Sequence, residues 1–459
     1  MYQLTLIILT LFSLLVQGLF HEKETNFERL MRNYENIEPS EQITEEWLEQ
    51  PLDHFNSSDN RVWKMRYFQN FEHFKPNGPI FLYIGGEGPL RGTVLAAGMI
   101  YDLASETHGA MFASEHRYYG DSIPLNPTKK ENLKYLSSQQ ALADIHKLLT
   151  DKKQSSRLKH SKVVVIGGSY AGNLAAWTRK LYPNLVDAVI ASSAPLLAKY
   201  DFKEYLETVG DDLKKYGSPS CYRNIEKQYK YYDDAFKTEE GIIKLKKEEN
   251  LCSNVSLNLP ENQFLFVEKR ANPIKILAQY GNVDKIKSYC NNSSQTLKQN
   301  SCEYFDFTES KYATYHTIPK NNNIWVWQIC TEFSYFQTTS SDKQPFGKSL
   351  TIETTSKLLC SLLYGIDDDS VRKSVERTNK FYGALHPNVT KVVFVNGELD
   401  PWHRLGILED ISEEAPAIFI PKASHCADLG PAQSNDPPEL TEARLIIKSI
   451  VKKWIKVAS

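Results

Sequence analysis

The sequence lacks a strong net charge, a second long apolar run and any pair of cysteines or histidines at the spacing of a metal site. Its 54 lysines and arginines balance 56 aspartates and glutamates, for a formal net charge of −2. Composition therefore gives no reason to expect a nucleic acid or an anionic membrane surface as a partner. A G-x-x-x-x-G-K phosphate loop is also missing. Because metal-site spacings and this loop are both absent, we expect neither a metal ion nor a cofactor. The sequence contains no internal repeat.

The one long apolar run, Leu4 to Val16, lies near the N-terminus. Its 13 uncharged residues are too few for a membrane span of about 20 residues, but they suit the core of a signal peptide. Small side chains at Val16 and Gly18 predict that residues 1–18 are a signal peptide cut after Gly18. No Lys or Arg precedes the run, which leaves a buried helix or a signal anchor as alternatives. No later stretch approaches 18 apolar residues, so we expect no membrane span in the mature chain.

Five acceptor sequences for N-glycosylation agree with export. They stand at Asn56, Asn254, Asn291, Asn292 and Asn388. Behind a signal peptide they support the secretory pathway, whose oxidising compartments permit disulfide bonds. We therefore expect an extracellular or lysosomal protein.

Apolar strands and helical segments alternate along most of the chain, after residues 20–50, which we expect to be a charged helical leader. Expected strands lie at 61–70, 80–84, 110–120, 162–168, 187–195, 391–397 and 417–423. Expected helices lie at 93–107, 136–149, 170–181 and about 440–456. This alternation predicts an α/β fold with a mostly parallel, doubly wound sheet.

The composition changes after Pro195 and becomes rich in Lys, Glu, Tyr and Asn. This stretch also holds six of the seven cysteines, which are Cys221, Cys252, Cys290, Cys302, Cys330 and Cys360. We therefore predict a catalytic domain made of 19–195 and 371–459, interrupted by a helical, disulfide-linked insertion at 196–370. Six cysteines can close three bridges in 15 ways, so the sequence leaves their pairing open.

The segment Gly167-Gly168-Ser169-Tyr170-Ala171-Gly172 follows an apolar strand and precedes a helix. This context is typical of a nucleophile elbow, a strained turn that lifts the serine Oγ above the sheet. The turn needs small residues two before and two after the serine, and Gly167 and Ala171 stand there. Glycine-rich turns of this kind can also hold a phosphate or merely reverse the chain. We predict that Ser169 is a nucleophile.

Two later loops supply the partners that such a serine requires. Asp400 follows the strand at 391–397, and His425 follows the next strand, 25 residues further on. The chain order Ser, Asp, His is that of α/β-hydrolases, in which the acid orients the histidine and the histidine takes the serine proton. His403 is a rival base, but it stands only three residues from Asp400 on the same loop.

The negative oxygen that forms during acyl transfer needs N–H donors. One candidate is the N–H of Tyr170, at the start of the helix after the serine. The second would come from the loop Gly85-Gly86-Glu87-Gly88 after an early strand, at Gly86 or Glu87.

Segments spread along the chain also match a known family. PLDHFN, RYFQN, FLYIGGEGP, EHRYYGDS, GGSYAGNLAAW, YPNLVDAVIASSAP, WQICTEF, VNGELDPWH and ASHCADL occur in this order. With them the chain resembles the serine peptidases that include lysosomal Pro-X carboxypeptidase, dipeptidyl peptidase II and thymus-specific serine protease. The resemblance covers nearly all of the mature chain and looks closest to the thymus-specific branch. Ala171 departs from the second glycine of the family's GGSYGG.

By this resemblance, Ser169 is the nucleophile, Asp400 the acid and His425 the base of an α/β-hydrolase with a helical, disulfide-linked insertion over its site. It implies a secreted or lysosomal serine peptidase that forms an acyl-enzyme, an exopeptidase acting near proline, with a peptide as its partner. A homodimer would also be in keeping with the family, although no residue here argues for one. The motifs alone leave two alternatives open, an esterase or lipase of the same fold and a catalytically silent binding protein.

The seventh cysteine, Cys426, lies beside the proposed base and outside the insertion. If the other six form three bridges, Cys426 is a buried free thiol and not a nucleophile. Thiol titration of the denatured, unreduced protein should then find about one free thiol per chain. A bridge between Cys426 and the insertion would contradict this prediction.

Overall fold

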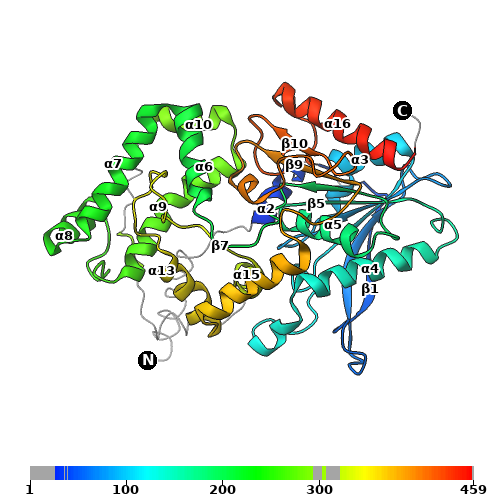
Figure 1. The fold of residues 1–459 in the computed structure, drawn as a ribbon, viewed down its shortest axis with the longest axis horizontal. Helices are drawn as coiled ribbons and strands as arrows, with labels where there is room; N and C mark the ends of the chain where they lie inside the picture. The colour runs from blue at the N-terminus through cyan, green and yellow to red at the C-terminus, as the bar shows by residue number, and fades with distance from the viewer. Residues whose placement is uncertain (1–25, 36, 39, 293–301, 306–320, 457–459) are drawn as a thin grey trace. The chain divides into compact units, whose positions relative to one another are not determined.

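The computed structural model describes residues 26–35, 37–38, 40–292, 302–305 and 321–456 (Figure 1). The expected signal peptide lies outside the described residues. The described chain divides into two compact units. The sheet unit comprises the described parts of 25–198, 318–333 and 373–459, and the helical unit those of 199–317 and 334–372.

The sheet unit is built on one eight-stranded sheet in the order β1-β2-β4-β3-β5-β6-β9-β10. Its strands are β1 (Ile43–Pro51), β2 (Val62–Asn70), β3 (Ile80–Ile84), β4 (Ala110–Ser114), β5 (Val163–Gly168), β6 (Ala188–Ser192), β9 (Val392–Gly397) and β10 (Ala417–Ile420). β1 pairs antiparallel with β2, and β2 pairs antiparallel with β4. All the other pairs in this sheet are parallel. This is the mostly parallel α/β-hydrolase arrangement that the sequence predicts.

Helices cover both faces of the sheet, which explains why its central strands are continuous apolar runs. α3 (Gly98–Thr107) and α16 (Pro438–Trp454) lie on one face, and α4 (Ser138–Gln154) and α5 (Tyr170–Leu181) lie on the other (Figure 1). Along β5, Val164 and Ile166 join the core beneath α3 and α16. The intervening residues of the strand face the other layer, and all are fully buried.

The remaining helices of the sheet unit are short, and the 3₁₀ and π-helical turns are labelled η. They are α2 (Asn26–Met31), η1 (Arg32–Tyr34), η2 (Gly92–Leu95), η3 (Lys130–Tyr135), α12 (Asn321–Gln328), η5 (Ile329–Phe333) and η7 (Pro401–Leu405). α15 (Asp368–Tyr382) contains residues of both units.

Two expectations about local structure are wrong. The charged segment at 43–50 is strand β1 and not helix, because it pairs with β2 over nine residues, from Ile43 opposite Asn70 to Pro51 opposite Val62. The strand expected at 110–120 ends at Ser114. There the Glu115 carboxylate accepts the N–H groups of three loop residues, which turns the chain away from the ladder (Leu90, Asp121 and Ser122).

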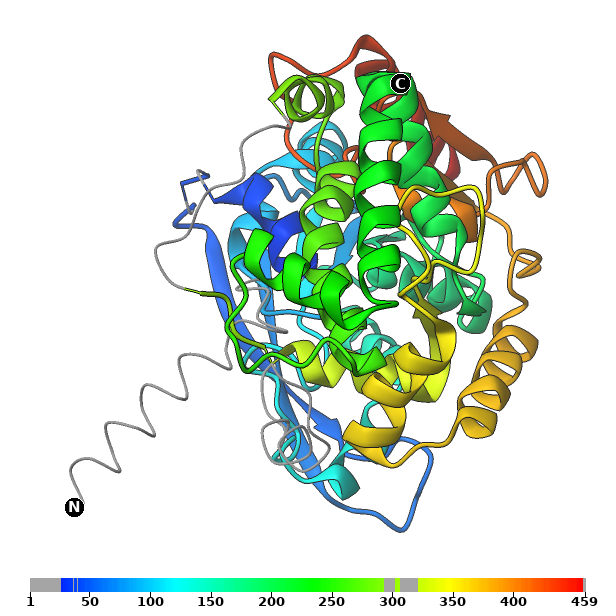
Figure 2. The same ribbon diagram turned by 90° about the vertical axis from the view of Figure 1, so that its left-hand side faces the viewer.

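Among its described residues, the helical unit contains one pair of parallel strands, β7 (Lys199–Asp201) and β8 (Ser334–Phe336). Helices make up most of the rest of its described chain (Figure 2). The helices and turns are α6 (Glu204–Asp212), η4 (Leu213–Gly217), α7 (Pro219–Ala235), α8 (Glu239–Glu248), α9 (Pro260–Tyr280), α10 (Val283–Asn292), α13 (Ile352–Ser356), η6 (Lys357–Ser361) and α14 (Leu362–Tyr364). Two disulfides staple this unit, Cys221–Cys290 and Cys252–Cys302. Cys330 and Cys360 are disulfide-bonded as well, whereas Cys426 is free and buried.

Residues 321–333 fall inside the insertion expected at 196–370, but their contacts group them with the sheet unit. Aromatic packing explains this assignment, since the ring of Phe333 contacts those of Tyr170 and Trp177 on α5. Within the described ranges, no helix has the length and apolarity needed to cross a membrane.

A buried ion pair anchors the loop after β4 to α4. The Arg117 guanidinium, which is fully buried, donates to both carboxylate oxygens of Asp144 at 2.6 and 2.8 Å. It also donates to the carbonyls of Leu52 and Tyr135. Burial by itself would raise the pKa of the Asp144 carboxyl, but the charge and hydrogen bonds of Arg117 lower it below its usual range.

Replacing Arg117 should therefore leave the buried Asp144 carboxylate without its guanidinium partner, although the ring of His54 still lies 2.7 Å from it. We expect Arg117→Met to lower the free energy of unfolding of the sheet unit by about 3–5 kcal/mol. All seven tryptophans lie in this unit, so their fluorescence during chemical denaturation measures its unfolding. Lys162→Met is the control, since Lys162 pairs with Asp187 at the surface and should contribute at most about 1 kcal/mol. Equal losses in the two variants would contradict the prediction.

Candidate functional site

The sequence-predicted triad residues follow three strands of one half of the sheet. Ser169 follows β5, Asp400 follows β9, and His425 follows β10. β5, β6, β9 and β10 are successive, parallel neighbours. Their carboxyl ends therefore share one edge of the sheet, which is where open α/β sheets place their sites.

The backbone at Ser169 forms a tight, strained turn between β5 and α5. Its φ of 58° and ψ of −131° lie in a region that residues with a side chain rarely adopt. A Cβ added to Gly167 would come within 2.0 Å of the Ala171 carbonyl oxygen, so only glycine fits there. Ala171 itself is accommodated in α5 and buried. Ser169 is only partly buried between buried neighbours, so the turn presents its side chain at the surface of the sheet edge.

The end of β6 holds the serine loop and the histidine loop together. The carbonyl of Ser192 accepts the N–H of Ser169 at 2.9 Å and the thiol of Cys426 at 3.8 Å. The hydroxyl of Ser193 accepts the N–H of Cys426 at 2.9 Å. Because Cys426 is the residue after His425, these bonds hold the loop of the candidate base and the loop of the candidate nucleophile at the same strand end.

Asp400 and His425 form a buried pair. His425 Nδ1 lies 2.8 Å from Asp400 Oδ2, and both side chains are almost completely buried. The other carboxylate oxygen of Asp400 accepts the N–H of Trp402 at 3.0 Å. Both oxygens are thus oriented by hydrogen bonds. A carboxylate can only accept here, so Nδ1 carries the hydrogen and Nε2 is the nitrogen able to take a proton.

The surroundings of His425 favour its charged form. Burial opposes a charged imidazole and lowers its pKa, but the negative charge and hydrogen bond of Asp400 outweigh this effect. The net result is a His425 pKa well above the ordinary histidine value. An imidazole in this setting can accept a proton from a neighbouring hydroxyl and hold the resulting charge.

The rival histidine, His403, does not occupy the same position. It lies in η7, and its ring packs edge-on against Phe419 at 5.3 Å. Its backbone N–H donates to the carbonyl of Asp400, whereas the Asp400 carboxylate is paired with His425. Burial lowers the pKa of His403, although the charge of Asp400 acts in the opposite direction.

The candidate donors for a negative oxygen come from the start of α5 and from the loop after β3. Tyr170 is the first residue of α5, where helix N–H groups have no partner within the helix. Gly86 and Glu87 follow β3, the neighbour of β5 in the sheet. Gly85 begins this loop pressed against the Ser114 carbonyl oxygen, which a Cβ on Gly85 would approach to 2.7 Å.

Sequence reasoning missed two further carboxyl groups near His425. Burial raises the pKa of Glu87 and of Asp428, and the charge of His425 acts in the opposite direction on both. Asp428 accepts the Ser192 hydroxyl at 2.5 Å. Glu87 Oε2 has no hydrogen-bond partner among the described residues. The sequence contained only a weak signal for these groups, since the acidic residues lie inside GGEGP and ASHCADL but gave no indication of burial.

Five asparagines are the predicted glycosylation sites. Asn56, Asn254, Asn291, Asn292 and Asn388 are all exposed, as glycosylation would require.

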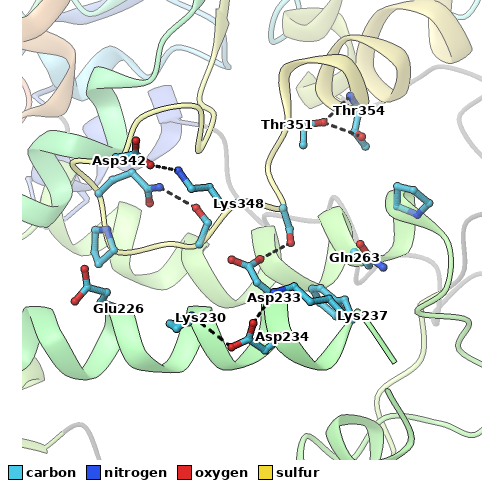
Figure 3. Close-up of a pocket in the computed structure, with 16 residues that line it drawn as sticks. Glu226, Lys230, Asp233, Asp234, Lys237, Gln263, Asp342, Lys348, Thr351 and Thr354 are labelled. Carbon is cyan, nitrogen blue, oxygen red and sulfur yellow. Dashed lines mark hydrogen bonds and ion pairs between the residues drawn. The ribbon is translucent and has the colours of Figure 1, made fainter. Parts of the chain in front are cut away.

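The helical unit also contains a hollow of about 640 Å³ lined by charged side chains (Figure 3). These charges largely satisfy one another, since Lys237 pairs with Asp234 at 2.6 Å and Ser349 donates to Asp233 at 2.8 Å.

The model of a family described as serine carboxypeptidase S28 matches residues 50–447. Thymus-specific serine protease of Mus musculus is 32% identical, over 89% of this chain and 87% of that protein. Lysosomal Pro-X carboxypeptidase of Mus musculus is 28% identical, over 89% of this chain and 88% of that protein. Among solved structures, proline iminopeptidase of Mycobacterium smegmatis is 13% identical, with a TM-score of 0.37 over 90% of this chain and all of that one.

The family match agrees with the residues at the strand ends, because it spans β5, β9, β10 and the loops that follow them. It covers far more than half of the 459 residues, and a relative above 30% identity covers most of the chain as well. The chain therefore belongs to the serine carboxypeptidase S28 family of serine peptidases.

Proposed function

We propose that this chain is an exported serine peptidase in which Ser169, His425 and Asp400 form the catalytic triad. The observation that carries the proposal is the convergence of two loops on the Ser192 carbonyl, which accepts from Ser169 and from the neighbour of His425. The buried pair between His425 and Asp400 supports it, because a serine hydroxyl needs an oriented base to become a nucleophile.

In this mechanism, Ser169 Oγ attacks the peptide carbonyl carbon while its proton passes to His425 Nε2. The N–H of Tyr170 and an N–H of Gly86 or Glu87 stabilise the negative oxygen. His425 then gives its proton to the leaving nitrogen as the C–N bond breaks, which leaves an ester on Ser169. Water attacks the ester and its proton passes to His425, which then returns a proton to Ser169 Oγ as the acyl C–O bond breaks and the acid product leaves.

We further propose that the substrate is a peptide cleaved near a chain end and beside proline, in an extracellular or lysosomal compartment. The relatives named lysosomal Pro-X carboxypeptidase support this choice of bond and compartment. The disulfide bonds support the secretory pathway, since reducing compartments do not normally preserve them. A peptide-library digest analysed by mass spectrometry would separate single-residue release, dipeptide release and internal cleavage.

Ser169→Ala and His425→Ala should each lower kcat on the identified peptide by a factor on the order of 10⁶, since the two residues act as a unit. Labelling by a fluorophosphonate should disappear in Ser169→Ala. His403→Gln is the matched control and should keep most of the turnover. Substantial peptide hydrolysis by Ser169→Ala would show that the assignment of the nucleophile is wrong.

Asp400→Asn should change both the rate and its pH dependence. Labelling by a fluorophosphonate requires neutral His425, so its rate rises as pH increases through the pKa of His425. Without the Asp400 charge that pKa falls, and the rising limb should move to lower pH. The plateau rate should fall by about 10⁴-fold, because the imidazole loses the partner that sets its tautomer. An unchanged midpoint would contradict the proposed role of Asp400.

A further inference from the structure

The side chain that follows the candidate nucleophile is enclosed on every side. Tyr170 is almost completely buried, and its ring contacts those of Trp325 and Phe333 at centroid distances of 5.3 and 5.4 Å. His116, from the loop after β4, packs against it at 5.5 Å. The residue whose N–H is the candidate oxyanion donor is therefore anchored by its own side chain.

The hydrogen bonds of this cluster have a definite direction. His116 Nδ1 lies 2.7 Å from the Arg117 carbonyl, which can only accept, so Nδ1 carries the hydrogen. Burial lowers the pKa of His116 to about 4, so its Nε2 is bare at neutral pH. The Tyr170 hydroxyl, 3.1 Å away, therefore donates to His116 Nε2.

The oxygen of the Tyr170 hydroxyl can also accept a hydrogen bond, and Gln328 donates it. Gln328 Nε2 donates to the Tyr170 hydroxyl at 2.9 Å, and Gln328 Oε1 accepts the Tyr119 hydroxyl at 2.7 Å. Burial raises the pKa of Glu332 to about 7, and an interaction with the Gln328 amide acts in the opposite direction. Gln328 is fully buried, so both ends of its amide are held inside the protein. A carboxylate or a methyl group could not make the same set of bonds.

The segment that carries Gln328 is in turn tied to α4. Glu332 accepts the N–H and the hydroxyl of Ser138, and the hydroxyl of Ser138 lies 2.8 Å from that of Tyr382. Gln328 ends α12, and the π-helical turn η5 continues the chain to Phe333. All these residues belong to the sheet unit.

We propose that Gln328 is a positioning residue of the oxyanion hole, which acts with His116 through the hydroxyl of Tyr170. A residue strained like Ser169 persists only where its surroundings determine its conformation. On the α5 side of the turn, the contacts of the Tyr170 side chain fix the backbone conformation. The inference rests on the proposed function, because the oxyanion hole matters only if Ser169 is acylated.

The test uses the full secreted chain with two single substitutions. Gln328→Met keeps the length of the side chain and removes the amide. Tyr170→Phe keeps the ring and its N–H and removes the hydroxyl. A displacement of about 1 Å at a reacting centre can lower a rate about 100-fold, so we expect kcat to fall at least about tenfold in each variant. KM should stay within about twofold, because the ground state makes less use of the oxyanion donors than the transition state does.

Tyr118→Phe is the matched control. The Tyr118 hydroxyl donates to the Asn132 carbonyl and not to the network around Tyr170. The control variant should alter the thermal midpoint like the test variants and keep the wild-type kcat. The proposal is overturned if both test variants keep kcat within twofold of Tyr118→Phe, or if only KM changes.

The rate of labelling by a fluorophosphonate separates this inference from the proposed function. Its phosphoryl oxygen also needs the oxyanion donors, so labelling should slow in parallel with kcat in both test variants. If the wild-type chain is labelled but cleaves no peptide, the peptidase proposal fails while the labelling rates still decide the role of Gln328. Labelling at the wild-type rate in both variants would overturn the inference by itself.

Discussion

The left-handed backbone at Ser169 is the constraint on which the candidate site depends. A serine with a φ of 58° is strained by about 1–3 kcal/mol, and it persists because both sides of the turn are held. β5 enters it as a buried central strand, and α5 leaves it with Tyr170 enclosed by aromatic rings. The Ser192 carbonyl binds the N–H of Ser169 at the centre. The strain is useful because it exposes one hydroxyl at the edge of a rigid sheet.

The electrostatic arrangement follows from the same edge. Asp400, Glu87 and Asp428 all act on His425 electrostatically, and Asp400 is hydrogen-bonded to its ring. Burial raises the pKa of Glu87 and Asp428, which opposes further negative charge beside the imidazole. Environment thus separates chemically similar carboxyls into different roles. The thiol of Cys426 belongs to this packing, since a Cβ on Gly168 would approach its sulfur to 2.9 Å.

Local patterns were reliable where burial alone decides the structure. The apolar runs of β3, β5, β6 and β9 are buried on both faces, so composition identifies them as strands without any knowledge of their neighbours. The pattern failed for Ile43–Pro51, whose charged residues favour helix locally but pair with β2 across the sheet edge. It also failed for Gln328 and Glu332, which read as part of the insertion but pack with the sheet unit.

The sequence by itself determined the alternation of strands and helices, the strand ends that carry Ser169, Asp400 and His425, and the odd cysteine outside the insertion. These features depend on short-range periodicity and on residues adjacent in the chain. Only the tertiary structure decided which cysteines pair as Cys221–Cys290 and Cys252–Cys302, and that the Ser192 carbonyl joins two loops. Only it brought Gln328 to Tyr170, 158 residues away. Such contacts arise from the packing of distant elements, and no local pattern in a single chain encodes them.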